Sequence, residues 1–295
     1  MWKGGAFERA GSADGATVVT QTGFCTMPRM LLAILSIVGL LTLAFIAICA
    51  LLYFKQEGLI FYPHPNDPQL VAQFRSRRVE IASNGVTLEG WWAENPGSVA
   101  PVTLLYFGGN GEDVLYSAST LRLLNARRML VVNYRGYGNS TGEPGQEALY
   151  KDALAIYDWA VANGTPPADI VVMGRSLGSG IATMLAGSRP VRSIVLITPF
   201  DSLAAVAAGH YPIVPVRWLL RHPFPSVDWA KQSTAPVLIL AAQRDFVVPA
   251  KHAQALFEVW PGKKQIHVLP GTGHNDIERD PDYYRLVNEF LAGTQ

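Results

Sequence analysis

The stretch Gly174-Arg175-Ser176-Leu177-Gly178 follows a short apolar run, residues 170–173, and opens a run of small residues, 179–183. A G-x-S-x-G sequence between a strand and a helix is the pattern of a nucleophile elbow. Its glycines permit a turn that is too sharp for side chains, and its serine is held in a strained backbone conformation. The sequence therefore predicts that the Ser176 hydroxyl stands clear at the carboxyl end of a strand, where open α/β folds place their chemistry.

Glycine-rich turns also bind phosphate, but the two nucleotide-binding patterns fail here. Gly178-Ser179-Gly180 could begin a G-x-G-x-x-G fingerprint, yet Thr183 occupies the position of the third glycine. No Gly-Lys-Ser/Thr follows any glycine loop, so the sequence has no P-loop. The alternative that stays open is an ordinary turn from strand to helix.

The composition describes one large domain with a short appendage. The 295 residues carry a formal net charge of +1, and the charged fraction is 16%. This balance excludes a basic surface for nucleic acid. The two cysteines, Cys25 and Cys49, give no disulfide framework and no candidate zinc-binding or catalytic thiol. The motifs imply no metal and no organic cofactor.

An uncharged segment, residues 30–54, explains the low charged fraction. As a helix it is roughly 37 Å long, enough to cross a hydrocarbon core of roughly 30 Å. A buried core helix seldom runs so far without a polar face. A cleaved signal peptide needs a small-x-small exit, which Ala47-Ile48-Cys49 supplies poorly. The sequence predicts a single transmembrane helix over 30–54, after a disordered segment over 1–29.

The orientation of this span depends on few charges. Arg29 and Lys55 flank it almost symmetrically, and Lys3 with Arg9 favours an inside N-terminus. We therefore expect a single-pass membrane protein whose domain, residues 55–295, lies on the extracytoplasmic side.

The rest of the chain alternates between strand and helix patterns. Residues 79–92 form a hairpin around Asn84-Gly85, and later strands are separated by helices, one of them expected over 112–126. This order predicts a mostly parallel sheet with helices on both faces. Residues 200–233 interrupt it without a strand pattern and are rich in aromatic side chains, which favours a small lid.

A serine hydroxyl needs a base within hydrogen-bond reach and a third group that orients the base. Asp245 follows the strand pattern that ends at residue 241, and His274 follows the one that ends at residue 269. Of the six histidines, His274 alone has both a strand-end position and glycine neighbours. Nucleophile, acid and histidine thus occur in a known chain order. Taken singly, such an aspartate is usually a turn residue and such a histidine structural, and Asp201 is the alternative acid.

An oxyanion needs preorganised N–H donors, and two places can supply them. One donor is the backbone N–H of Leu177, directly after the serine. The other comes from the loop 108–113, where we prefer Asn110 and take Gly109 second, while Glu112 and Asp113 are expected to cap the next helix. An ordinary glycine turn with acidic caps is the alternative for this loop.

Residues 102–113, 133–144 and 171–180 together resemble the α/β-hydrolase superfamily. They are most similar to its small membrane-anchored branch of α/β-hydrolase-domain (ABHD) proteins and to related bacterial proteins. The resemblance covers about residues 57–293. One departure is Gly108, since the branch usually has His-Gly-Asn where this chain has Gly-Gly-Asn.

The resemblance implies an α/β-hydrolase fold and a catalytic set made of Ser176, Asp245 and His274, with Asn110 and Leu177 as the oxyanion hole. It suggests a membrane-tethered serine hydrolase that cleaves carboxylic esters or thioesters through an acyl-enzyme. The expected partners are a small-molecule or lipid-like acyl substrate and the bilayer. A peptidase of the same fold and a catalytically inactive, membrane-bound binding protein are the alternatives.

Overall fold

A computed structural model describes residues 28–98 and 100–293. The segment predicted to be disordered lies outside these residues except for its last two positions, and so do Lys3 and Arg9, on which the predicted orientation depends. The chain divides into two compact units, Met1–Ile48 and Cys49–Gln295. The second unit therefore starts six residues before the predicted boundary at residue 55.

Helix α1 covers Arg29–Ile60 and is long and apolar enough to cross a membrane. It is thus a candidate span by length and composition. The predicted span ended at residue 54, but the helix continues through Lys55 and Glu57. No proline occurs between residues 30 and 62, and the buried Gln56 gives this last part tertiary contacts.

An eight-stranded sheet forms the centre of the second unit, in the order β1-β2-β4-β3-β5-β6-β7-β8. The entry hairpin β1–β2 is antiparallel, β2 pairs with β4 antiparallel, and the pairs from β4 to β8 are parallel, as predicted. The strands are β1 (Arg78–Ser83), β2 (Val86–Glu94), β3 (Thr103–Phe107), β4 (Arg128–Val132), β5 (Ile170–Arg175), β6 (Ser193–Ile197), β7 (Val237–Ala242) and β8 (Lys264–Leu269).

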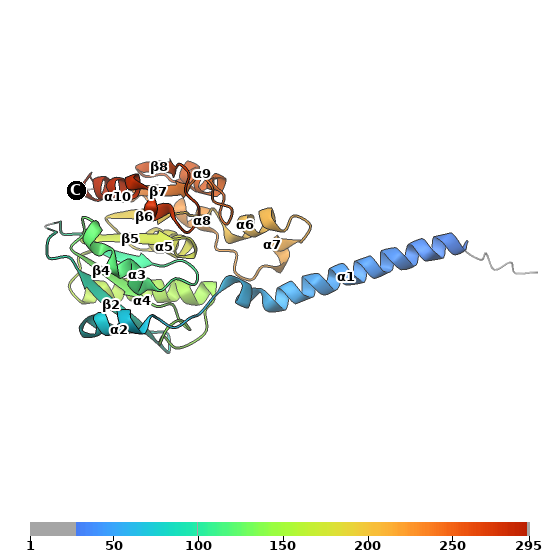
Figure 1. Cartoon of the computed structure of the whole chain (residues 1–295), viewed down its shortest axis with the longest axis horizontal. Coiled ribbons are helices and arrows are strands. Elements are labelled where there is room, and N and C mark those ends of the chain that lie inside the picture. The colour runs from blue at the N-terminus through green and yellow to red at the C-terminus, as the bar shows by residue number, and fades with distance from the viewer. Residues whose placement is uncertain (1–27, 99, 294–295) are drawn as a thin grey trace, which may run out of the picture. The chain divides into compact units, whose positions relative to one another are not determined.

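Both faces of the sheet are covered by helices (Figure 1). Strand β5 shows why, since Ile170 and Val172 belong to one apolar cluster while Val171 and Met173 belong to the other. Successive side chains of a strand point to opposite faces, so a fully apolar strand needs cover on both. The first cluster includes residues of α4 (Gln146–Ala162), α5 (Leu177–Ser188) and α9 (Ala250–Val259), and the second includes α3 (Val114–Ser119) and α10 (Pro281–Gly293).

Helix α3 is shorter than the expected helix over 112–126. It begins after Asp113, whose side chain accepts the Leu115 N–H, and a separate 3₁₀ turn follows at Leu121–Leu123. The Thr120 hydroxyl donates to the Ser117 carbonyl at 2.8 Å. Such side-chain bonds compete with the helical ladder and favour its end. A further short helix, α2 (Pro68–Gln73), lies in the proline-rich segment before β1.

Three short helices connect β6 to β7 in the region predicted to be a lid. They are α6 (Leu203–His210), α7 (Val216–Leu219) and α8 (Ser226–Ala230), and no strand occurs in this described stretch. Helices α6 and α7 lie together at one end of the domain (Figure 1). We refer to residues 200–233 as the lid.

Candidate active site

Ser176 lies in the turn between β5 and α5, with φ 48° and ψ −115°. Its backbone N–H donates to the Ile197 carbonyl at 2.9 Å, which ties the turn to β6. A positive φ at a residue with a side chain stores roughly 1–3 kcal/mol of strain. The surrounding contacts explain the two glycines. A Cβ on Gly174 would lie 2.4 Å from the Gly178 carbonyl oxygen, and one on Gly178 would lie 2.0 Å from the Phe107 carbonyl oxygen.

The structure brings Ser176, His274 and Asp245 together. The Ser176 Oγ and His274 Nε2 atoms are 2.8 Å apart, and His274 Nδ1 is 2.7 Å from Asp245 Oδ2. Each residue follows a different strand, β5, β7 or β8, so the carboxyl edge of the parallel sheet assembles side chains that are far apart in sequence. The geometry allows a proton to pass from the hydroxyl to the imidazole while the carboxylate holds the ring.

Asp245 is almost completely buried, with 1% of its side chain exposed. Its Oδ1 accepts the N–H groups of Val247 and Val248 at 2.9 and 2.7 Å, which leaves Oδ2 for His274. These bonds fix the carboxylate plane and satisfy the buried charge. The alternative acid, Asp201, pairs instead with His252, at 2.8 Å from Oδ1 to Nδ1. Asp201 is therefore not the partner of His274.

The loop after β3 lies beside Ser176, since a Cβ on Gly109 would be 3.8 Å from the Ser176 Cβ. The N–H of Gly109, the second choice of oxyanion donor, donates to Glu112 Oε2 at 2.7 Å. Within residues 28–98 and 100–293, the N–H groups of Asn110 and Leu177 have no protein acceptor. Both residues line the cavity that contains Ser176.

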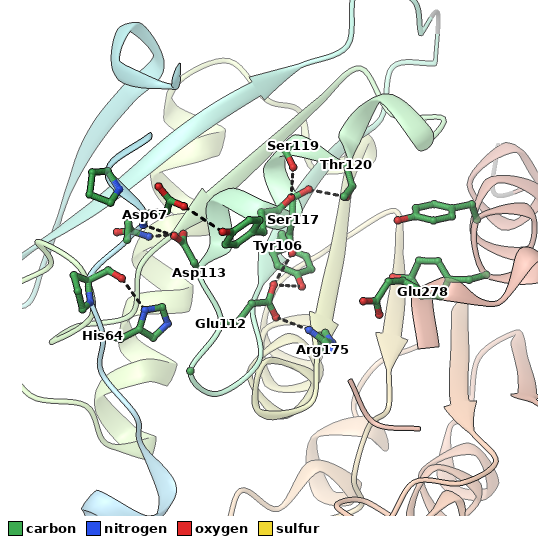
Figure 2. A pocket seen from close by; sticks show the side chains of 17 residues that line it. His64, Asp67, Tyr106, Glu112, Asp113, Ser117, Ser119, Thr120, Arg175 and Glu278 are labelled. Carbon is green, nitrogen blue, oxygen red and sulfur yellow. Dashed lines mark hydrogen bonds and ion pairs between the residues drawn. The ribbon is translucent and has the colours of Figure 1, made fainter. Parts of the chain in front are cut away.

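Glu112 does not cap α3 as expected; Asp113 alone does so. The Glu112 carboxylate instead accepts hydrogen bonds from Tyr106 and Ser117 and pairs with Arg175 at 3.3 Å, and Figure 2 shows it among these three side chains. Burial, with the Glu112 charge added, raises the pKa of Tyr106 well above its usual value, so its hydroxyl stays a donor. The cluster lines a cavity of about 770 Å³ that contains none of Ser176, His274 and Asp245.

Two tyrosines also hold this loop, and the sequence did not assign them a role. The Tyr134 hydroxyl donates to the Gly108 carbonyl at 2.7 Å, and that of Tyr137 donates to Asn110 Oδ1 at 2.9 Å. Burial raises the pKa of Tyr137 to about 12. Both tyrosines belong to the glycine-rich loop after β4, and this is the sequence signal that could have indicated their role. At the departure from the ABHD pattern, Gly108, a Cβ would lie 3.0 Å from Val114 Cγ1, so a side chain there requires Val114 to shift.

A cavity of about 440 Å³ opens onto Ser176. Its walls are mostly apolar, and no aspartate, glutamate, lysine or arginine lines it among the residues that the structure describes. The lid contributes Leu203, Val206, Val216 and Leu219. In the same described ranges no three His, Cys, Asp or Glu side chains gather as a set of metal ligands.

Comparisons with known proteins agree with this fold. The model of the family described as the alpha/beta hydrolase fold matches residues 102–212. An uncharacterized protein of Mycobacterium tuberculosis is 33% identical over 251 residues, which covers 83% of this chain and 89% of the relative. Human ABHD12B is 32% identical over 191 residues, or 56% of this chain and 52% of its own length. The chain thus spans about half of ABHD12B.

Solved structures show the same fold at low identity. An esterase of Pyrococcus furiosus superposes with a TM-score of 0.61 and 20% identity, covering 79% of this chain and 97% of the esterase. Est1E of Butyrivibrio proteoclasticus, solved with ferulic acid, gives a TM-score of 0.58 and 18% identity, covering 73% of this chain and 98% of Est1E. From its family match, its relatives and its sheet, this chain belongs to the α/β-hydrolase superfamily, in the branch of the α/β-hydrolase-domain (ABHD) proteins.

Proposed function

We propose that this protein is a membrane-tethered serine hydrolase that cleaves carboxylic esters or thioesters. The observation that carries the proposal is the continuous hydrogen-bond chain from Ser176 through His274 to Asp245. A hydroxyl is a weak nucleophile near neutral pH, and this arrangement is the usual way to activate one. The superfamily and the esterases of similar fold add support.

In the first half-reaction Ser176 Oγ attacks the acyl carbon while His274 Nε2 takes its proton. The carbonyl oxygen becomes an oxyanion that accepts hydrogen bonds from the N–H groups of Leu177 and Asn110. When the tetrahedral intermediate collapses, the bond to the alcohol or thiol breaks and His274 gives the leaving group its proton. The acyl group is then bound to Ser176.

Water completes the cycle. His274 takes a proton from the water, whose oxygen attacks the acyl carbon, and a second oxyanion forms at the same N–H groups. Collapse breaks the bond to Ser176 Oγ, which receives the proton back, and the carboxylic acid leaves. Throughout, Asp245 holds the imidazole in the tautomer with hydrogen on Nδ1 and stabilises the imidazolium.

Helix α1 supplies the membrane part of the proposal, and an extracytoplasmic domain remains the predicted orientation. A peptidase would need a carboxylate near Ser176 to bind a substrate amine, and the described walls of that cavity hold none. An inactive binding protein would have no need for a strained serine bonded to a histidine.

A fluorophosphonate probe tests the nucleophile directly. We expect the full-length protein to be labelled, the Ser176→Ala variant to be unlabelled, and Ser188→Ala, at the other end of α5, to be labelled like wild type. Equal labelling of wild type and Ser176→Ala would reject Ser176 as the nucleophile, and no labelling of any of them would favour the binding protein.

Glu112→Gln is expected to lower kcat roughly 10- to 100-fold with little change in KM, because a small misplacement of the oxyanion loop is costly in the transition state. An amide loses the negative charge that pairs with Arg175, and its NH₂ group faces either the donors Gly109 and Arg175 at Oε2 or the two hydroxyls at Oε1, which must then turn to accept. Steady-state kinetics with p-nitrophenyl acetate measure this. Glu278→Gln is the matched control, since Glu278 lines the same cavity (Figure 2) without a hydrogen bond to the loop among the described contacts. A raised KM at constant kcat would contradict the positioning role.

A further inference from the structure

The end of helix α1 lines the cavity that contains Ser176. Leu52, Tyr53, Gln56, Leu59 and Ile60 all face this cavity. Their spacing of one, three and four residues is that of one helix face, which covers the last turns of α1. Leu51 and Phe54, next to them in sequence, are exposed and do not line it.

This part of α1 is bonded to the lid. The Gln56 side chain donates to the Leu219 carbonyl at 3.1 Å and accepts the Arg221 N–H at 2.7 Å. Glu57 pairs with the Arg221 side chain at 3.2 Å, and the Arg221 guanidinium also lies 5.3 Å from the centre of the Tyr53 ring. A buried amide that satisfies two backbone groups at the end of α7 fixes the helix against the lid.

The cavity suits a hydrocarbon chain. Its volume of about 440 Å³ is within the roughly 300–1,000 Å³ of small-ligand sites, and no aspartate, glutamate, lysine or arginine is among the described lining residues. Ser176 and the two candidate oxyanion donors, Asn110 and Leu177, line the same cavity, so a bound ester places its acyl carbon beside them. Three large apolar side chains that neighbour cavity-lining residues in sequence are themselves exposed, namely Ile213 (80%), Trp218 (89%) and Phe246 (83%).

We propose that the last turns of α1 are one wall of an acyl-chain site, closed on the other side by the lid, and that this wall selects long-chain acyl esters or thioesters. The proposal rests on the proposed function and adds to it a substrate class and the residues that select it. Leu52 and Tyr53 also belong to the uncharged run that makes α1 a candidate span. The helix that tethers the protein is then also part of its specificity.

The test compares two neighbouring tryptophan variants of the full-length protein in detergent micelles. Leu52→Trp adds bulk to the wall, whereas Leu51→Trp adds the same bulk to the exposed face one residue away. The substrates are p-nitrophenyl acetate and p-nitrophenyl palmitate, and the quantity measured is the ratio of their kcat/KM values. We expect Leu52→Trp to lower the palmitate-to-acetate ratio by roughly tenfold or more, and Leu51→Trp to leave it unchanged.

A second variant covers the case in which Leu52→Trp does not fold. Gln56→Leu keeps the size of the side chain but leaves the Leu219 carbonyl and the Arg221 N–H without this partner. The end of α1 is then held less firmly against the lid, and we expect the palmitate-to-acetate ratio to fall, as in Leu52→Trp. An unchanged ratio in both variants, or an equal fall in Leu51→Trp, overturns the acyl-chain site while acetate turnover still supports the hydrolase. Absence of acetate turnover by wild type overturns the hydrolase and the acyl-chain site together.

Discussion

Alanine at Ser176, alanine at His274 and both changes together are expected to lower kcat by the same factor, about 10⁶. The proton that Ser176 loses in the attack passes to His274 over a distance of 2.8 Å. Removing either side chain therefore abolishes the same nucleophilic step. The remaining turnover comes from water attack assisted by the oxyanion donors and substrate binding alone. Single-turnover measurements with p-nitrophenyl acetate determine the three rates.

Asp245→Asn belongs to the same series and should be less costly, about 10⁴ in kcat. The N–H groups of Val247 and Val248 hold one side-chain oxygen, which an asparagine can still provide. Its NH₂ group then faces His274 Nδ1, which must become an acceptor, and the hydrogen moves to Nε2. In this tautomer the imidazole cannot accept the proton of Ser176.

His252→Ala is the matched control, because it removes an equally close histidine–aspartate pair, with Asp201, that is not bonded to Ser176. We expect its kcat to stay near that of wild type. If the double alanine variant lost kcat by the product of the two single factors, Ser176 and His274 would act independently. If His252→Ala lost as much activity as His274→Ala, the base would lie elsewhere.

The sequence predicted the parts of this site that depend on local geometry and strand order. The elbow follows from five consecutive residues, because the turn itself requires glycine at 174 and 178. Asp245 and His274 were predicted because loops after parallel strands meet at one edge. Which aspartate pairs with which histidine was left open with Asp201, since that choice depends on side-chain packing across the sheet edge.

The side-chain contacts of Glu112 and Gln56 were not predicted. Glu112 looked like a helix cap because acidic residues favour helix starts, but its carboxylate binds Gly109 and Arg175. The predicted span ends at residue 54, and the helix itself continues to Ile60, where Gln56 finds partners 163 and 165 residues away. Neither pairing has a periodic signature, so hydropathy alone could not reveal it.

Gly178→Ala is expected to destabilise the protein by about 3 kcal/mol or more, at the upper end of what added methyl groups cost in packed sites. The new Cβ would lie 2.0 Å from the Phe107 carbonyl oxygen, and the obstacle is backbone at the end of β3 rather than a side chain that can rotate. Relief requires the start of α5 to move away from β3. Urea unfolding of the full-length protein in detergent micelles, followed by tryptophan fluorescence, measures the change in the free energy of unfolding.

The matched control is Gly209→Ala in α6, where an added Cβ meets nothing within 4 Å. Alanine reduces the freedom of the unfolded chain and should be neutral or stabilising by up to about 1 kcal/mol. A destabilisation below about 1 kcal/mol for Gly178→Ala would show that β3 and α5 can separate easily. The oxyanion loop begins directly after Phe107, so any Gly178→Ala protein that still folds should also have a lower kcat. Of the two variants, only Gly178→Ala should therefore lose both stability and activity.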